Sequence, residues 1–146
     1  MDTQQLPAPA TMAARRVLCI DGYPDTAASE VELLVLSGYD ARACTNGPAG
    51  LAAVRDFSPD ACVMNVRLQG MDGYELARQI RAEVGDRVLL VAVTGWTEAA
   101  VADRLTAAGF DRVFLKPVDP PQLIRALDAG IALNRLLREL EQGRVR

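Results

Sequence analysis

Polar residues stand at the ends of several apolar runs, where an open α/β sheet places its chemistry. They are Asp21, which is followed by Gly22, Asn65, Thr94, which is followed by Gly95, and Lys116, which is followed by Pro117. Carboxylate and amide oxygens can ligate a hard cation, while a hydroxyl and an ammonium group can donate hydrogen bonds to an oxyanion. The chain of 146 residues has no histidine, which excludes Ser-His-Asp and Cys-His catalysis, histidine phosphotransfer and most zinc sites. Any chemistry must therefore use carboxylates, amides, hydroxyls and lysine.

Five successive β–α units are expected to position these residues. Apolar runs predict strands, and helical patterns between them predict helices. The predicted strands cover residues 16–21, 39–44, 60–65, 87–94 and 112–116, and the predicted helices cover 24–37, 47–57, 73–84 and 97–108, with a last helix opening at DPPQL. The helix over 97–108 has Thr97 as its expected N-cap.

The expected fold class is α/β, a doubly wound parallel sheet of five strands in the flavodoxin-like order 2-1-3-4-5. The third and fourth runs are almost continuously apolar, which is typical of central parallel strands covered on both faces. A TIM-barrel fragment or a half-Rossmann unit is disfavoured. The first strand leads into DGYPD rather than into a glycine-rich phosphate loop.

The strand-end residues, the segment GMDGYELA and the Lys-Pro pair together resemble the response-regulator receiver domain of two-component signalling. The resemblance covers about residues 15 to 130. In that family two adjacent acids after the first strand hold a magnesium ion, and an aspartate after the third accepts a phosphoryl group. The resemblance places Asp21 at the first acid, Gly22 at the second and Asn65 at the phosphoacceptor.

The same resemblance assigns the remaining positions. Thr94 and Lys116 match the hydroxyl and the lysine that contact the phosphoryl oxygens. Val113, three residues before the lysine, stands where the family has an aromatic switch residue. Asp72 and Gly73 retain the turn that opens the third helix. The chain therefore departs from the family pattern at the second acid, the phosphoacceptor and the switch position.

The departures predict a lost reaction. An amide is a poor nucleophile and yields no acyl phosphate, so we expect Asn65 to accept no phosphoryl group. The family site holds three carboxylates and one lysine, whereas here Asp21 is balanced by Lys116. Two unit charges about 4 Å apart attract by roughly 4 kcal/mol at an effective dielectric of about 20, so we expect weak or absent Mg²⁺ binding and no cofactor. Lys116 is expected to pair with Asp21 and to donate to the Asn65 amide oxygen, as a hydrogen-bonded plug.

The expected function is that of an atypical receiver, not an enzyme, which acts by phosphorylation-independent protein–protein interaction with a sensor kinase or another regulator. Three alternatives stay open. In the first, Asn65 is an engineered replacement of an acceptor aspartate, although Gly22 would then be a second change. In the second, Asp21 serves as phosphoacceptor in an active receiver. In the third, the vacated metal pocket holds a small molecule, as in a small-molecule sensor. Taken singly, each polar residue also fits a purely structural role.

Two surface regions are candidates for partner contact. Trp96 follows Thr94 on the loop into the fourth helix. In the last helix Ala126, Gly130, Leu133, Leu137 and Leu140 recur with a period of 3.5, and Leu136 widens this seam. We expect a leader over residues 1–14, a receiver-like domain over 15–130 and a C-terminal extension over 131–146. The extension is expected to form a homodimer or to dock on a partner helix, and no output enzyme or DNA-binding domain is expected within the chain.

Composition sets the remaining expectations. A net charge of −3 gives no support for direct nucleic-acid binding. No apolar run approaches the roughly 18 residues of a membrane span, and the N-terminal segment lacks the pattern of a secretion signal. Three cysteines, Cys19, Cys44 and Cys62, lie in or beside apolar runs, which favours reduced, buried thiols in a cytoplasmic protein.

Overall fold

The chain folds as strands and helices in alternation. The structure, a computed structural model, describes residues 14–68, 70–95 and 99–143. The strands are β1 (Arg16–Ile20), β2 (Asp40–Cys44), β3 (Ala61–Asn65), β4 (Leu89–Thr94) and β5 (Arg112–Leu115). The helices are α1 (Pro24–Leu36), α2 (Gly47–Phe57), α3 (Gly73–Val84), α4 (Ala99–Ala108) and α5 (Pro120–Glu141), with a short 3-10 helix at Gly85–Arg87.

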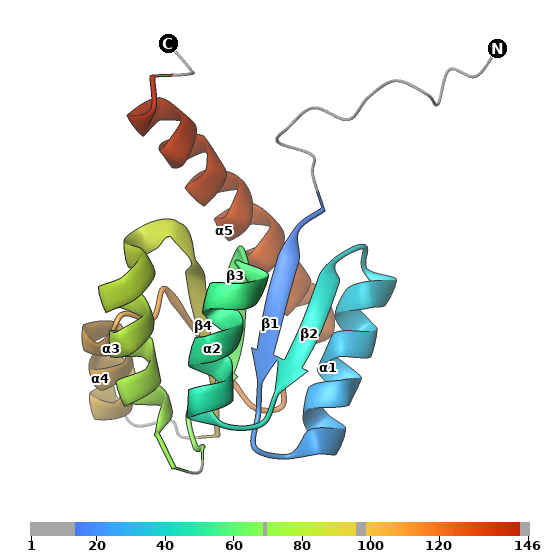
Figure 1. Cartoon of the computed structure of the whole chain (residues 1–146). Helices are drawn as coiled ribbons and strands as arrows, with labels where there is room; N and C mark the ends of the chain where they lie inside the picture. Colours follow the sequence, from blue (N-terminus) through green and yellow to red (C-terminus); the bar gives the residue numbers. More distant parts are fainter. Residues whose placement is uncertain (1–13, 69, 96–98, 144–146) are drawn as a thin grey trace, which may run out of the picture.

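The five strands form one parallel sheet in the order β2-β1-β3-β4-β5, which confirms the predicted fold class. Helices α1 and α5 cover one face, and α2, α3 and α4 cover the other (Figure 1). In the register, Ile20 lies beside Met64, and Thr94 lies beside Leu115. The residues that follow these strand ends therefore meet at one edge of the sheet.

The burial pattern explains why β1, β3 and β4 are central. Every residue of β3 and β4 is buried, while β2 and β5 are partly exposed edge strands. Alternate residues of one strand enter different cores, since successive side chains of a strand point to opposite faces. Leu18 and Ile20 pack with α2, α3 and α4, whereas Val17 and Cys19 pack with α1 and α5.

Helix ends follow the local sequence closely. Asn46 and Asp72 cap α2 and α3, because their side-chain oxygens accept hydrogen bonds from the N–H groups of Ala49 and Glu75, both at 2.8 Å. The predicted start of the fourth strand at residue 87 is wrong, since Gly85–Arg87 forms the 3-10 helix and β4 begins at Leu89. The expected cap Thr97 lies outside the described residues.

All three cysteines are unpaired, as expected. Cys19 and Cys62 are buried, and Cys44 is only half-buried. Burial raises the pKa of the Cys62 thiol to about 12 and raises the pKa values of the other two thiols as well. The thiols are therefore protonated and weakly nucleophilic at neutral pH.

Helix α5 runs along the sheet and projects beyond the edge where the strands begin (Figure 1). Its inner side buries Leu123, Ala126, Leu127 and Ile131. A Cβ at Gly130 would lie 2.6 Å from Leu89 Cδ2, so this glycine lets the helix lie close to β4. The continuous seam predicted for a partner is thus wrong in its first half, because Ala126 and Gly130 pack on their own sheet.

The later part of α5 has one anchored side and one exposed side. Arg135 Nη2 donates to Asp60 Oδ2 at 2.8 Å, and Arg138 lies 3.7 Å from Asp60 Oδ1. Contacts of the helix with the domain therefore continue beyond the predicted boundary at residue 130. The other side exposes four leucines by 45–54%: Leu133, Leu136, Leu137 and Leu140. Within the described residues, no helix combines the length and the apolarity that crossing a bilayer requires.

The loop between β3 and α3 is held against the strand end by a close backbone approach. The Gly73 N–H group donates to the Val66 carbonyl oxygen at 2.8 Å. A Cβ at Gly73 would lie 2.8 Å from Val66 Cα and 2.9 Å from Val66 O. Only glycine fits this contact without a shift of the loop that follows Asn65.

We predict that Gly73→Ala lowers the free energy of unfolding by about 1 to 3 kcal/mol, because a new methyl group is forced against backbone atoms. Chemical denaturation measures the change. Gly95→Ala is the matched control, since among the described residues nothing lies within 4 Å of a Cβ at this position. Equal stability of the Gly73→Ala variant and the unsubstituted chain would contradict the close approach.

Candidate functional site

Three polar side chains are buried where strands end. Asp21, Asn65 and Thr94 are 2%, 8% and 6% exposed, and they are the buried polar or charged residues within the described part of the chain. Asn65 and Thr94 line a cavity of about 460 Å³ together with residues from four other segments. The remaining lining residues are Gly22, Tyr23, Arg67, Leu68, Gly95 and Lys116. We call Asp21, Gly22, Asn65, Thr94 and Lys116 the strand-end site.

Asp21 has a structural role in the turn from β1 to α1. Its Oδ1 atom accepts a hydrogen bond from the Tyr23 N–H at 2.9 Å, and its own N–H donates to the Cys44 carbonyl at 3.0 Å. Its carboxylate is buried rather than turned into the cavity. Asp21 therefore holds the loop that follows β1 in place.

Gly22 leaves open space where the resemblance implies a second acid. A Cβ built on Gly22 would meet only backbone oxygens, Arg67 O and Thr45 O, both at 3.9 Å, which is ordinary van der Waals contact. The backbone would accept a larger side chain at this position. The backbone conformation at residue 22 therefore does not exclude an acidic side chain, and the acid is absent only because the residue is a glycine.

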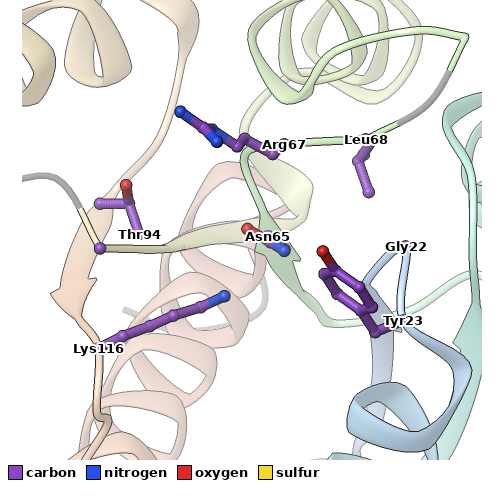
Figure 2. A pocket seen from close by; sticks show the side chains of 8 residues that line it. Gly22, Tyr23, Asn65, Arg67, Leu68, Thr94 and Lys116 are labelled. Atoms are coloured by element: carbon purple, nitrogen blue, oxygen red, sulfur yellow. The ribbon is translucent and has the colours of Figure 1, made fainter.

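The predicted hydrogen-bonded plug is not present. The structure records no ion pair between Lys116 and Asp21 and no hydrogen bond between Lys116 and Asn65, all of which are described residues. Lys116 is exposed at the end of β5, and its peptide bond to Pro117 is cis. In Figure 2 the Lys116 ammonium and the Tyr23 hydroxyl both point toward the Asn65 amide, with the open cavity around them.

Glu30, on the inner side of α1, is a functional candidate that the sequence analysis missed. Its Oε1 atom is fully buried and accepts no hydrogen bond. Burial and, secondly, the nearby Asp21 carboxylate raise the pKa of Glu30 to about 7, although Lys116 opposes the shift. A second acid, partly protonated at neutral pH, therefore lies near Asp21 but outside the cavity lining.

Arg67, two residues after Asn65, is a second missed residue. It lines the cavity on the same side as Thr94, and its guanidinium points toward Thr94 in Figure 2. Arg67 and Lys116 place two cations at one cavity. No periodic pattern in the sequence indicates this, because Arg67 lies in a loop.

The other predicted site residues that the structure describes lie apart from the cavity. Val113 is half-buried and packs against the core beside α4. Trp96 lies outside the described residues. The exposed leucines of α5 lie on the projecting end of that helix, at the opposite edge of the sheet (Figure 1).

The described residues do not fit the magnesium site that the resemblance implies. They contain no group of three or more His, Cys, Asp or Glu side chains placed to hold a metal ion. Asp21 is buried and accepts a backbone hydrogen bond, Gly22 has no side chain, and Asn65 is neutral. Since Mg²⁺ requires several oxygen ligands in a strict octahedral geometry, no step is assigned to it.

Comparison with known proteins identifies the family. The chain matches the response regulator receiver domain over residues 17–128, and it belongs to that family. Receiver domains interact with sensor kinases in two-component systems. The DNA-binding response regulator MtrA of Mycobacterium tuberculosis (strain ATCC 25618 / H37Rv) is 30% identical over 122 residues, which cover 82% of this chain and 52% of MtrA. The chain thus spans about half the length of this relative.

Solved structures show the same fold. A receiver domain protein (CheY-like) from Methanospirillum hungatei JF-1 superposes with a TM-score of 0.79 at 21% identity, covering 84% of this chain and 98% of that chain. NtrX from Brucella abortus gives a TM-score of 0.82 at 23% identity, covering 92% of this chain and 30% of that chain. At these identities the likeness establishes the architecture of the sheet and its helices.

We predict that Glu30→Gln has a higher free energy of unfolding than the unsubstituted chain and that this difference grows as the pH rises. The native state binds the Glu30 proton more tightly than the unfolded chain does, because the native pKa is raised from 4.5 to about 7. The bound proton of Glu30 stabilises the native state of the unsubstituted chain fully below the unfolded pKa of 4.5. This stabilisation is lost as the pH rises through the native pKa of about 7. The advantage of the variant in unfolding free energy should therefore grow by about 1 to 3 kcal/mol between about pH 5 and about pH 8.

Denaturation at each pH measures this difference, with Glu32→Gln as the matched control. Glu32 is an exposed glutamate on the same helix. A difference between Glu30→Gln and the unsubstituted chain that stays constant with pH would show that Glu30 does not lose its proton in a buried environment.

Proposed function

We propose that the chain is a receiver that takes no phosphoryl group and acts in two-component signalling by binding other proteins, a sensor kinase or another regulator. The observation that carries this proposal is the buried Asn65 at the phosphoacceptor position of an otherwise intact receiver fold. The Asn65 amide cannot attack a phosphoryl donor as a carboxylate does. The proposal includes no enzyme activity, no direct nucleic-acid contact and a cytoplasmic location.

Charge supports the proposal independently of nucleophilicity. With Gly22 and Asn65 in place of two acids, the site lacks two attractions of roughly 4 kcal/mol each for a nearby unit charge, at an effective dielectric of about 20. Glu30 does not line the cavity, and its raised pKa leaves it partly neutral. We infer that Mg²⁺ binding is weak or absent.

The region that would transmit a phosphoryl signal is also altered. An ordinary receiver couples new charge at its acceptor to a repacking of the face near β5. Here Val113 fills the switch position with a half-buried aliphatic side chain that has no ring to reorient. The binding surface would then stay in one state, and regulation would come from the presence of the partner.

The projecting end of α5 is the surface proposed for self-association. Leu133, Leu136, Leu137 and Leu140 are about half exposed, and burying what remains exposed adds about 1 kcal/mol for each leucine. Two copies would bury eight leucines and gain roughly 8 kcal/mol, while association costs about 4 to 15 kcal/mol. We therefore propose a weak homodimer in which the exposed leucines of two α5 helices pack together.

Acetyl phosphate with Mg²⁺ tests the central proposal. The unsubstituted chain should show no phosphoryl adduct by intact mass, because Asn65 offers no nucleophilic carboxylate. The double variant Gly22→Asp/Asn65→Asp is the positive control and should gain the adduct, since Gly22 has room for a side chain. Asn65→Asp alone should react more slowly than the double variant, because it still lacks the second acid. An adduct on the unsubstituted chain above background would contradict the proposal.

Light scattering at high micromolar concentration tests the homodimer. The unsubstituted chain should show a mass above that of one chain of 15.7 kDa, whereas Leu137→Gln/Leu140→Gln should be monomeric because the packed surface is lost. Leu36→Gln is the matched control, since Leu36 is 80% exposed on α1 and lies outside the proposed interface. A monomeric unsubstituted chain at this concentration, or a dimer unchanged by the double substitution, would rule the homodimer out.

A further inference from the structure

A pocket at the edge where the strands begin is lined by three arginines. It measures about 180 Å³ and lies where the ends of α2 and α3 and the segments before β3 and β4 meet α5 (Figure 1). Arg55, Arg87 and Arg138 line it, and Asp60 is the one acid among the described residues of its lining. Helix C-termini carry partial negative charge, which favours arginines at this edge. We call this the arginine pocket.

Arg87 has no acidic partner within the pocket. It is exposed, and its Nε donates to the neutral Val84 carbonyl oxygen at 3.2 Å. The neighbouring Arg55 is already bonded to Glu83, with 2.9 Å between Arg55 Nε and Glu83 Oε2. Asp86 precedes Arg87 in the chain but does not line the pocket, and no ion pair of Arg87 is recorded among the described residues. Arg87 is therefore available to an acid from another chain.

Arg138 adds a second positive charge that is incompletely neutralised. Its Nε atom is buried and donates no hydrogen bond within the described part of the chain. Its Nη2 atom lies 3.7 Å from Asp60 Oδ1, which is longer than a hydrogen bond. Asp60 Oδ2 already accepts from Arg135 Nη2 at 2.8 Å and from the Arg16 N–H at 2.9 Å. The arginine pocket therefore attracts a further negative charge.

Acids stand at the end of the helix whose exposed leucines are proposed to pair. Glu139 and Glu141 follow Arg138, Glu141 is exposed, and no ion pair is recorded for either within the described residues. Asn134 marks the level of the arginine pocket along α5, because its Nδ2 donates to the Asp86 carbonyl oxygen at 3.3 Å. Glu141 lies on the same face as Asn134, since seven residues make about two turns, and about 10 Å further along the helix.

An antiparallel pair of α5 helices brings the acids of one copy to the arginines of the other. If the helices cross midway between Leu136 and Leu137, each exposed leucine meets a leucine of the second copy. Glu141 then lies within about one turn of the level of Asn134 in the second copy. Because a two-fold axis matches the same flank of both helices, it lies on the side of Arg87. A parallel pair would instead place the acids of both copies at one level, where like charges repel.

We propose that two copies associate with their α5 helices antiparallel, and that the Glu141 carboxylate of each copy binds Arg87 at the arginine pocket of the other. The inference rests on the proposed homodimer and adds its direction and its charge contacts. The two-fold symmetry gives two such pairs in each dimer. Complementary charges of this kind determine orientation and specificity more than affinity. Arg144 and Arg146 follow in the sequence and lie outside the described residues, so they have no assigned contact.

Charge reversal tests these pairs, with the dissociation constant measured by sedimentation equilibrium. Arg87→Glu and Glu141→Arg, each alone, should weaken the dimer about tenfold, or roughly 1.4 kcal/mol, because two attractions become two repulsions. An equimolar mixture of the two variants should associate as tightly as the unsubstituted chain, to within about threefold. The reason is that both pairs of the mixed dimer are attractive: Glu at residue 87 meets Arg at residue 141, and the second pair is unchanged.

Two matched controls make the same charge changes outside the proposed interface. Arg78→Glu reverses an exposed charge on α3, which covers the face of the sheet opposite α5. Glu32→Arg reverses an exposed charge on α1. Neither control should change the dissociation constant by more than about twofold, because surface substitutions away from a contact have small effects.

The outcomes separate this inference from the homodimer on which it rests. Weak association of each variant alone, with recovery in the mixture, supports the inference. Equal losses in the two controls would overturn it as a general effect of charge. A dimer that neither reversal weakens, or a loss that the mixture does not recover, would overturn the antiparallel charge contacts while the homodimer stands. A monomeric unsubstituted chain would overturn the homodimer and this inference together, so the two failures are distinguishable.

Discussion

The structure depends on the charge balance at the carboxyl ends of its parallel strands. Asp21 is a buried carboxylate at the end of β1, and Glu30 lies close behind it. Further acids at positions 22 and 65 would add like-charge repulsion to this buried group, which a bound cation would offset. With a glycine and an amide in those places, the cationic residues that line the cavity are the chain's own Lys116 and Arg67. The proposed loss of phosphoryl transfer follows from the amide at Asn65, and the proposed loss of Mg²⁺ binding follows from this charge balance.

The molecule separates its two candidate binding regions along the sheet. The strand-end site lies where the strands end, and the projecting part of α5 lies beyond the edge where they begin (Figure 1). Asp60 links α5 to the start of β3 through Arg135, so the helix is held by the sheet and not by the strand-end site. Changes in the cavity therefore need not alter the exposed leucines. This separation is consistent with a receiver whose protein contacts persist without a covalent signal.

Much of the fold could be predicted from the sequence because its signals are local. Continuous apolar runs located β3 and β4, and the strand-end residues followed from the alternation of strands and helices. Asn65 and Thr94 do line one cavity with Lys116, as parallel strands require. The start of β4 was placed two residues early, because Arg87 was counted with the apolar run that follows it, although it belongs to the 3-10 helix.

The residues that were missed depend on tertiary structure in different ways. Glu30 shares the inner side of α1 with Ala27 and Leu34, and this helical spacing could have identified it. Arg67 lies in a loop, where no period fixes the direction of a side chain. The predicted hydrogen-bonded plug is wrong because Lys116 is exposed and reaches toward an open cavity. The predicted partner seam on α5 is wrong at Gly130, which packs against Leu89 of the same chain. A period of 3.5 shows which residues share a helix face, but not whether that face packs on the chain's own sheet or on a partner.

The most direct test of the electrostatic account is a calorimetric titration of Mg²⁺ into the unsubstituted chain at low ionic strength, where attraction is least screened. We expect no saturable heat up to about 10 mM Mg²⁺, roughly tenfold above the dissociation constant of about 1 mM that marks the weakest specific Ca²⁺ sites. Saturable binding at millimolar or lower concentration, with an ordered Mg²⁺ beside Asp21 in a crystal structure, would contradict it.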